Sequence, residues 1–112
     1  MIRETGENMN EKKLIEAIAE KNVNVDEFVE LVLSDEEVKG LVLEHLLNNR
    51  NIMIYYHCYY IISKASELQP ELFYSYWNEI ASLLNHSNSY HRDIGLTVIA
   101  NLAKVDYEDY FA

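Results

Sequence analysis

Two stretches of this chain repeat one another at a shift of 37 residues, and this repeat constrains the fold more than any other feature of the sequence. Residues 46–68 align with residues 83–105 at five identical positions. The identical pairs are Leu46 and Leu83, Leu47 and Leu84, Asn48 and Asn85, Asn51 and Asn88, and Ile62 and Ile99. A small residue is also kept, since Cys58 aligns with Gly95. The repeat predicts two copies of one helix pair, because the apolar spacing that packs such a pair is preserved.

Glycine and proline are scarce, with three glycines and one proline among 112 residues. Sandwiches and small barrels need many tight turns built from those residues, so the composition disfavours them. Apolar residues make up 49% of the chain and charged residues 25%, which is typical of a globular domain. We therefore predict one all-α domain without a sheet.

Capping patterns divide the chain into helices. Asn24 followed by Glu27, and Ser34 followed by Glu37, match the capping box, which satisfies the free N–H groups of a first helical turn. Pro70 suits the first position of another helix because proline lacks an N–H. Together with apolar residues three and four positions apart, these signals predict about six helices. Their expected ranges are 11–21, 25–33, 35–48, 52–67, 70–85 and 90–104.

The second copy of the repeat carries a recognisable pattern. Leu83 and Leu84 end its first helix, a polar turn follows at 85–89, and the next helix opens with Arg92 three residues before the small Gly95. A Leu pair, a polar turn and an Arg–x–x–small sequence form the pattern of HEAT repeats, which this chain resembles. The resemblance implies an α-solenoid of stacked antiparallel helix pairs that serves as a protein-binding scaffold.

The resemblance covers residues 35–105 and departs from the family pattern in two places. Tyr55 stands where the second copy has Arg92, and His86 and Ser87 replace the acid and proline common in the turn. The domain organisation it implies is a flexible leader at 1–9 and one helical-repeat domain at 10–112. Within that domain we expect a capping helix pair at 10–34, repeats at 35–68 and 69–105, and the start of an incomplete third repeat at 106–112.

The charge balance is strongly acidic, with 19 acidic and nine basic side chains and a formal net charge of −10. Such a chain lacks the basic clusters that bind nucleic acid or an anionic membrane surface. It favours a protein or peptide partner with basic residues. The longest uncharged run, residues 51–63, is shorter than the roughly 20 residues of a membrane-spanning helix. The single cysteine cannot form an internal disulfide, so we expect a cytoplasmic protein.

Tyrosines are concentrated in the helix expected at 52–67. Helical spacing and the repeat register place a set of residues on the side opposite the apolar positions. We predict that this set binds a partner: Tyr56, Tyr60, Ser63, Glu67, Asp93 and Thr97. In a helix-pair stack the second helices line the concave face, and exposed tyrosines are suited to recognition. In the alternative interpretation, the tyrosine rings pack against a neighbouring helix.

Residue patterns typical of catalysis or cofactor binding are missing from the sequence. The glycines are isolated, so they do not form a phosphate-binding loop, and Cys58 has no second cysteine with which to bind zinc. We therefore expect no enzymatic activity, cofactor or metal. Our leading hypothesis is a non-enzymatic protein-interaction module. The alternative is a small-ligand-binding or enzyme-accessory domain with a tyrosine-lined pocket near Tyr56, Tyr60 and Trp77.

The last seven residues align, by the same shift of 37, with the start of a repeat's first helix. Tyr107, Tyr110 and Phe111 are large and belong to a stub too short to bury them by itself. We expect either a fragment of a longer repeat protein or self-association through this end, with a two-fold homodimer as the closed arrangement. In the alternative interpretation, the stub folds back and the protein is a monomer.

Overall fold

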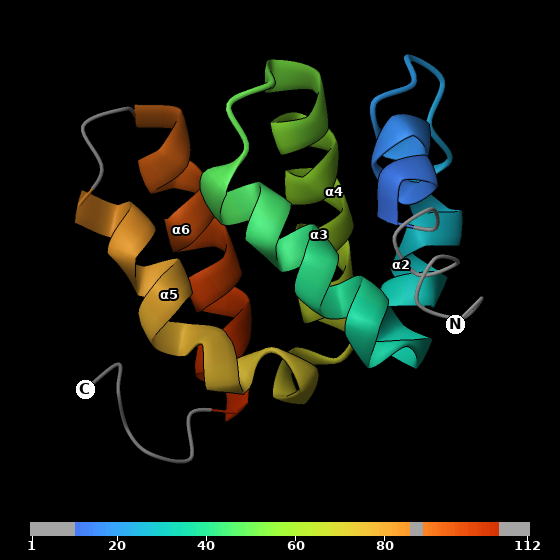
Figure 1. The fold of residues 1–112 in the computed structure, drawn as a ribbon. Helices are drawn as coiled ribbons and strands as arrows, with labels where there is room; N and C mark the ends of the chain where they lie inside the picture. The colour runs from blue at the N-terminus through green and yellow to red at the C-terminus, as the bar shows by residue number, and fades with distance from the viewer. Residues whose placement is uncertain (1–10, 86–88, 106–112) are drawn as a thin grey trace, which may run out of the picture.

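The structure is a computed structural model that describes residues 11–85 and 89–105. Within these two ranges the chain forms α-helices and short 3-10 segments and no strand, which confirms the all-α prediction (Figure 1). None of the helices it describes combines the length and apolar character that crossing a membrane requires.

The helices follow the order expected from the capping signals. Residues 11–18 form the first, and the others are α2 (Val25–Ser34), α3 (Glu36–Asn48), α4 (Ile52–Leu68), α5 (Trp77–Ala81) and α6 (Ser89–Leu102). Four 3-10 segments adjoin the last two helices: η1 (Pro70–Leu72), η2 (Tyr74–Tyr76), η3 (Ser82–Asn85) and η4 (Ala103–Val105).

Consecutive helices pair in opposite directions, so the chain runs up and down three times (Figure 1). The helix at 11–18 precedes α2, α3 precedes α4, and α5 precedes α6. Helix α4 is central, because it packs against α2 on one side, α6 on the other and its own partner α3. The second helices of the three pairs therefore lie in one row, in the order α2, α4 and α6.

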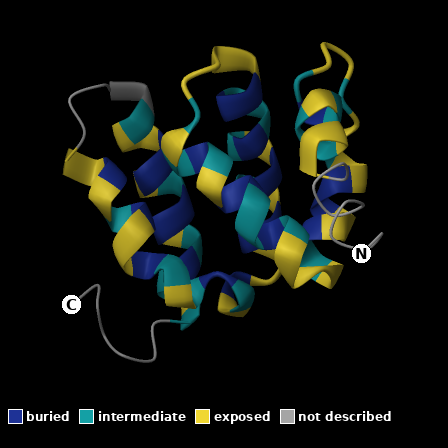
Figure 2. Cartoon of the chain, in the orientation of Figure 1, coloured by how far each residue is buried: buried dark blue, intermediate teal, exposed yellow. Residues whose placement is uncertain are grey.

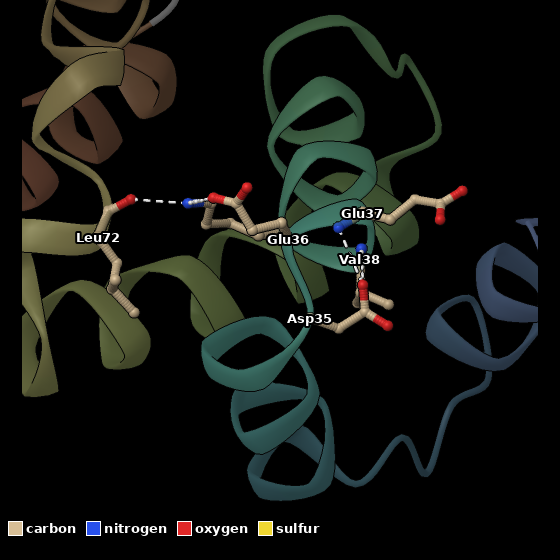
Figure 3. Close-up of polar contacts among 6 residues, drawn as sticks. Asp35, Glu36, Glu37, Val38 and Leu72 are labelled. Atoms are coloured by element: carbon tan, nitrogen blue, oxygen red, sulfur yellow. Dashed lines mark hydrogen bonds and ion pairs between the residues drawn. The ribbon is translucent and has the colours of Figure 1, made fainter.

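Of the two predicted N-cap residues, Asn24 is correct and Ser34 is wrong by one residue. Asn24 caps α2, with its side-chain oxygen accepting the N–H of Glu27 at 3.2 Å. Ser34 does not cap α3: it is still helical, and its hydroxyl donates to the carbonyl of Glu30. The extended residue is Asp35, whose carboxylate accepts the N–H groups of the first turn of α3 (Figure 3).

The helix predicted at 70–85 is not continuous, because η1 and η2 precede the five-residue α5. Pro70 begins η1, as its missing N–H favours. The 3-10 segment turns once every three residues, which brings Pro70 and Phe73 to the same side, where both are buried. Aromatic residues are also modest helix formers. Burial of the aromatic side chains thus decides the local geometry here.

The core runs through all three helix pairs, with buried residues on the facing sides of the helices (Figure 2). Two chain segments approach closely at Gly95, since a Cβ added there would lie 2.9 Å from Leu83 Cβ and 3.3 Å from the carbonyl oxygen of Ile80. The aligned Cys58 is fully buried. Gly95 thus stands where α6 packs closely against η3, and Cys58 is part of the buried core.

Candidate functional site

The candidate site is the exposed side of the α2, α4 and α6 row, and all the residues predicted to bind a partner lie outside the buried core. Tyr60, Glu67 and Asp93 are exposed, and Tyr60 retains 51% of its accessible surface. The remaining predicted residues, Tyr56, Ser63 and Thr97, are half-buried.

A groove of about 580 Å³ runs beside the second half of α4. We call it the Tyr60 groove. One wall is formed by residues 23–26, where the chain enters α2, and the other by the exposed side of α4. The α4 residues that line it are Tyr60, Ser63, Lys64 and Glu67. Three of the predicted residues therefore meet in one groove, while Asp93 and Thr97 lie on the neighbouring helix α6, outside its lining.

Two contacts join the first two helices to α4. Lys64 of α4 forms an ion pair with Asp26 of α2, and both side chains are largely exposed. Pairs of this kind contribute at most about 1 kcal/mol, so this one orients the walls more than it stabilises the fold. Deeper in, Nδ1 of His57 hydrogen-bonds the carbonyl oxygen of Ile18 and so anchors the end of the first helix to α4.

A polar network fixes α6 against α4 next to the groove. The Asn101 amide donates to the carbonyl oxygen of Ser63 at 3.1 Å and to the Ser66 hydroxyl oxygen at 3.0 Å. The Ser66 hydroxyl in turn donates to the same Ser63 carbonyl. Ser66 is fully buried, and a satisfied buried network of this kind specifies how two helices align.

The tyrosines of α4 have different environments. Tyr60 is exposed, with its ring centroid 5.2 Å from that of Tyr59. Tyr55 is buried against the His91 ring of α6, at 4.5 Å between centroids. Burial, followed by the proximity of Tyr56 and Tyr59, raises the pKa of Tyr55 to about 12. Tyr55 therefore belongs to the contact between α4 and α6. Its alignment with Arg92 gave no sign of this.

Two residues considered for ligand chemistry are in the interior. Trp77 is 7% exposed and packs beside Tyr74, so it does not line the Tyr60 groove. Cys58 is fully buried, and burial raises the pKa of its thiol to about 12, which keeps it protonated at neutral pH. Within residues 11–85 and 89–105, no three metal-binding side chains of the His, Cys, Asp or Glu type converge. Tyr107, Tyr110 and Phe111 lie outside the described residues.

No protein-family model, curated protein or solved structure matches this chain. The Tyr60 groove offers a large exposed ring, hydroxyl groups and the Glu67 carboxylate along one open trough. That combination suits an extended peptide that brings an apolar side chain to the ring and a cation to the carboxylate.

Proposed function

We propose that the protein is a non-enzymatic interaction module that binds a protein or peptide along the α2, α4 and α6 face. The Tyr60 groove carries the proposal, because an exposed aromatic ring beside a trough of about 580 Å³ provides a rigid contact surface. Half of the Tyr60 side chain's surface is free to be buried by a partner.

The architecture we propose is a HEAT-like α-solenoid. Its support is the shift of 37 residues, which aligns the α3 and α4 pair with the α5 and α6 pair, together with the packing of α4 between α2 and α6. In such stacks each pair contacts only its neighbours, and the second helices form an extended binding face.

The partner we propose carries basic residues. The chain has a net charge of −10, and complementary fields raise association rates and select partners. Within the groove, Asp26 and Lys64 neutralise one another, whereas Glu67 is exposed. A lysine or arginine of the partner would therefore be placed near Glu67.

A photo-crosslinking experiment identifies the partner. A benzophenone amino acid replaces Tyr60 in the full chain, and a matched variant carries it at Glu44, an exposed position on α3. We expect a partner captured by the first variant and not by the second. Equal capture from both positions would contradict binding at this face.

The affinity of the captured partner then tests the contribution of the ring. We expect Tyr60→Ala to weaken binding by about 1–3 kcal/mol, measured by calorimetry, because a buried aromatic anchor is lost. The melting temperature should stay close to that of the parent, since the ring lies on the surface. The control is Leu84→Ala, an exposed apolar side chain on η3 away from the groove, which should leave the affinity unchanged. A large drop in melting temperature for Tyr60→Ala would show that the ring supports the fold instead.

A further inference from the structure

A second groove, separate from the Tyr60 groove, lies between the first helix, α2 and the start of α3. It encloses about 370 Å³ and shares no lining residue with the first. We call it the Leu41 groove. Its floor is apolar and is formed by Leu14, Ala17, Phe28, Val38 and Leu41.

The walls of the Leu41 groove are held by contacts within the chain. Asp35 caps α3 at one edge, with its carboxylate 2.9 Å from the N–H of Glu37 (Figure 3). Val38 and Leu41, three residues apart, present the same side of α3 to the groove. Lys39 reaches away from it, to the carbonyl oxygen of Leu72 in η1 at 3.0 Å. The groove is thus formed before any ligand arrives, as binding sites usually are.

The rim of the groove is predominantly acidic. Among the residues that the structure describes, Glu11, Asp35 and Glu37 lie on it together with one cation, Lys13. The Asp35 carboxylate is already engaged with backbone N–H groups, whereas Glu11 and Glu37 are exposed. An apolar floor below an acidic rim, on a chain with a net charge of −10, complements an apolar side chain flanked by cations.

We infer that the Leu41 groove is a second docking site, which takes a large apolar side chain from a basic segment of a partner protein. A volume of about 370 Å³ lies within the range of sites that enclose a ligand group. Helix α2 contributes to both grooves, but they share no lining residue. The inference is therefore independent of the proposed function, because each groove can be disabled separately.

An NMR titration of the full chain with a synthetic peptide tests the inference. The probe is a short peptide with one central leucine flanked by lysines. We expect its largest amide shift changes at Leu14, Val38 and Leu41. A matched peptide with serine at the centre should bind about tenfold more weakly, because the apolar burial is lost. Equal affinity of the two peptides would overturn the inference.

A charge reversal on the rim separates docking from general attraction to an acidic protein. We expect Glu37→Lys to weaken binding of the leucine peptide about fivefold or more. The matched control is Glu44→Lys, which makes the same charge change on the same helix at an exposed position outside the groove and should have little effect. Equal losses from the two variants would overturn the inference, because they would indicate non-specific attraction.

Three further results would contradict the inference. One would show that the peptide binds at the Tyr60 groove, and the other two would show that the Leu41 groove is filled by something other than a partner protein. Tyr60→Ala should leave the peptide-induced shift changes at Leu14, Val38 and Leu41 unchanged. Shift changes centred on the Tyr60 groove would overturn the second site while favouring the first. A dimer in sedimentation that Glu37→Lys dissociates would assign the groove to a second copy. Binding that emerges only after deletion of residues 1–9 would assign it to the chain's own N-terminal segment. Either of the last two results would also overturn the inference.

Discussion

The two glycines described in the structure differ in how much space surrounds the position where a Cβ would lie. Gly95 lies where α6 meets η3, and a Cβ there would meet Leu83 Cβ at 2.9 Å. Gly40 lies within α3, where a Cβ would meet nothing within 4 Å. Both gain helix propensity when replaced by alanine, so packing alone decides the sign of the change.

We expect Gly95→Ala to lower the free energy of unfolding by about 1–3 kcal/mol, because overpacking outweighs the gain in propensity. Gly40→Ala, as the matched control, should raise it by about 0.5–1 kcal/mol. Urea unfolding of the two variants measures both values. A stabilised Gly95→Ala would show that η3 and α6 are not in close contact.

The buried Cys58 thiol and Tyr55 hydroxyl make the free energy of unfolding sensitive to alkaline pH. Burial raises the pKa of Cys58 from 9.0 to about 12 and that of Tyr55 from 10.0 to about 12. At a pH between the ordinary pKa of each group and its raised pKa in the folded protein, the group is deprotonated in the unfolded chain and protonated in the folded one. The unfolded state therefore binds fewer protons than the folded state. Stability is therefore unaffected by these two groups below about pH 9 and falls as the pH rises toward 12.

The Tyr55→Phe variant isolates one of the two groups. We expect the free energy of unfolding of the parent to fall between pH 10 and 12, by up to about 1.4 kcal/mol per pH unit for Tyr55. The variant should show a shallower decline, because the contribution of Tyr55 is removed while that of Cys58 remains. Urea unfolding at a series of alkaline pH values measures the difference. Parallel curves for parent and variant would contradict the burial of the Tyr55 hydroxyl.

At the scale of the element, Lys39 joins two helix pairs. Its ammonium donates to Glu36 and to the carbonyl oxygen of Leu72, and it lies within 6 Å of the Phe73 and Tyr76 ring centroids. Its side chain is 8% exposed, so the contact with η1 is shielded from water. The irregular segment after α4 is thus attached to α3 by one side chain.

We expect Lys39→Met to lower the free energy of unfolding by about 1–3 kcal/mol, because the Leu72 carbonyl loses its donor. Lys64→Met, the control, removes an exposed ion pair and should cost less than about 1 kcal/mol. Chemical denaturation of both proteins compares the two losses. Equal losses would mean that Lys39 contributes no more than a surface charge.

The positions of the helices could be predicted from the sequence wherever the signal was local. Asn24 and the apolar spacing gave the start of α2 correctly. Ser34 and Asp35 are both good capping residues, and only the backbone conformation distinguishes the helical one from the extended one. The segment at 70–76 is also held by a hydrogen bond from Lys39 to the Leu72 carbonyl. Lys39 is 33 residues away in the sequence, so the helical spacing within 70–85 does not show this contact.

The candidate site was predictable to a similar degree. Helical spacing alone put Tyr60 and Glu67 on the exposed side of α4. The groove wall formed by residues 23–26 could not be predicted from the sequence, because it depends on how the first helix pair packs against α4. The Leu41 groove could not be predicted from the sequence for the same reason, because its floor combines residues of three separate helices.

At the scale of the whole molecule, the pair formed by α3 and α4 is central. Helix α4 packs against both α2 and α6, whereas each of those helices has one such neighbour in the row. In the stack of helix pairs that we propose, contacts join adjacent pairs, so we expect the outer pairs to open more readily than the inner one.

We therefore expect amide hydrogen exchange to be slowest in α4 and faster in residues 11–18. Mass spectrometry of the full chain, with peptides resolved for each helix, gives the order. Protection as strong in residues 11–18 as in α4 would indicate one cooperative unit instead of separable pairs.

The burial of Lys39 also gives the protein a built-in chemical reporter. Lys12, Lys13, Lys21, Lys64 and Lys104 are exposed, whereas Lys39 is buried between α3 and η1. An amine-acylating reagent will modify the exposed lysines directly, but it can reach Lys39 only while that seam is open. The time course of acylation at this one amine therefore records how often the second and third helix pairs separate in an otherwise native population.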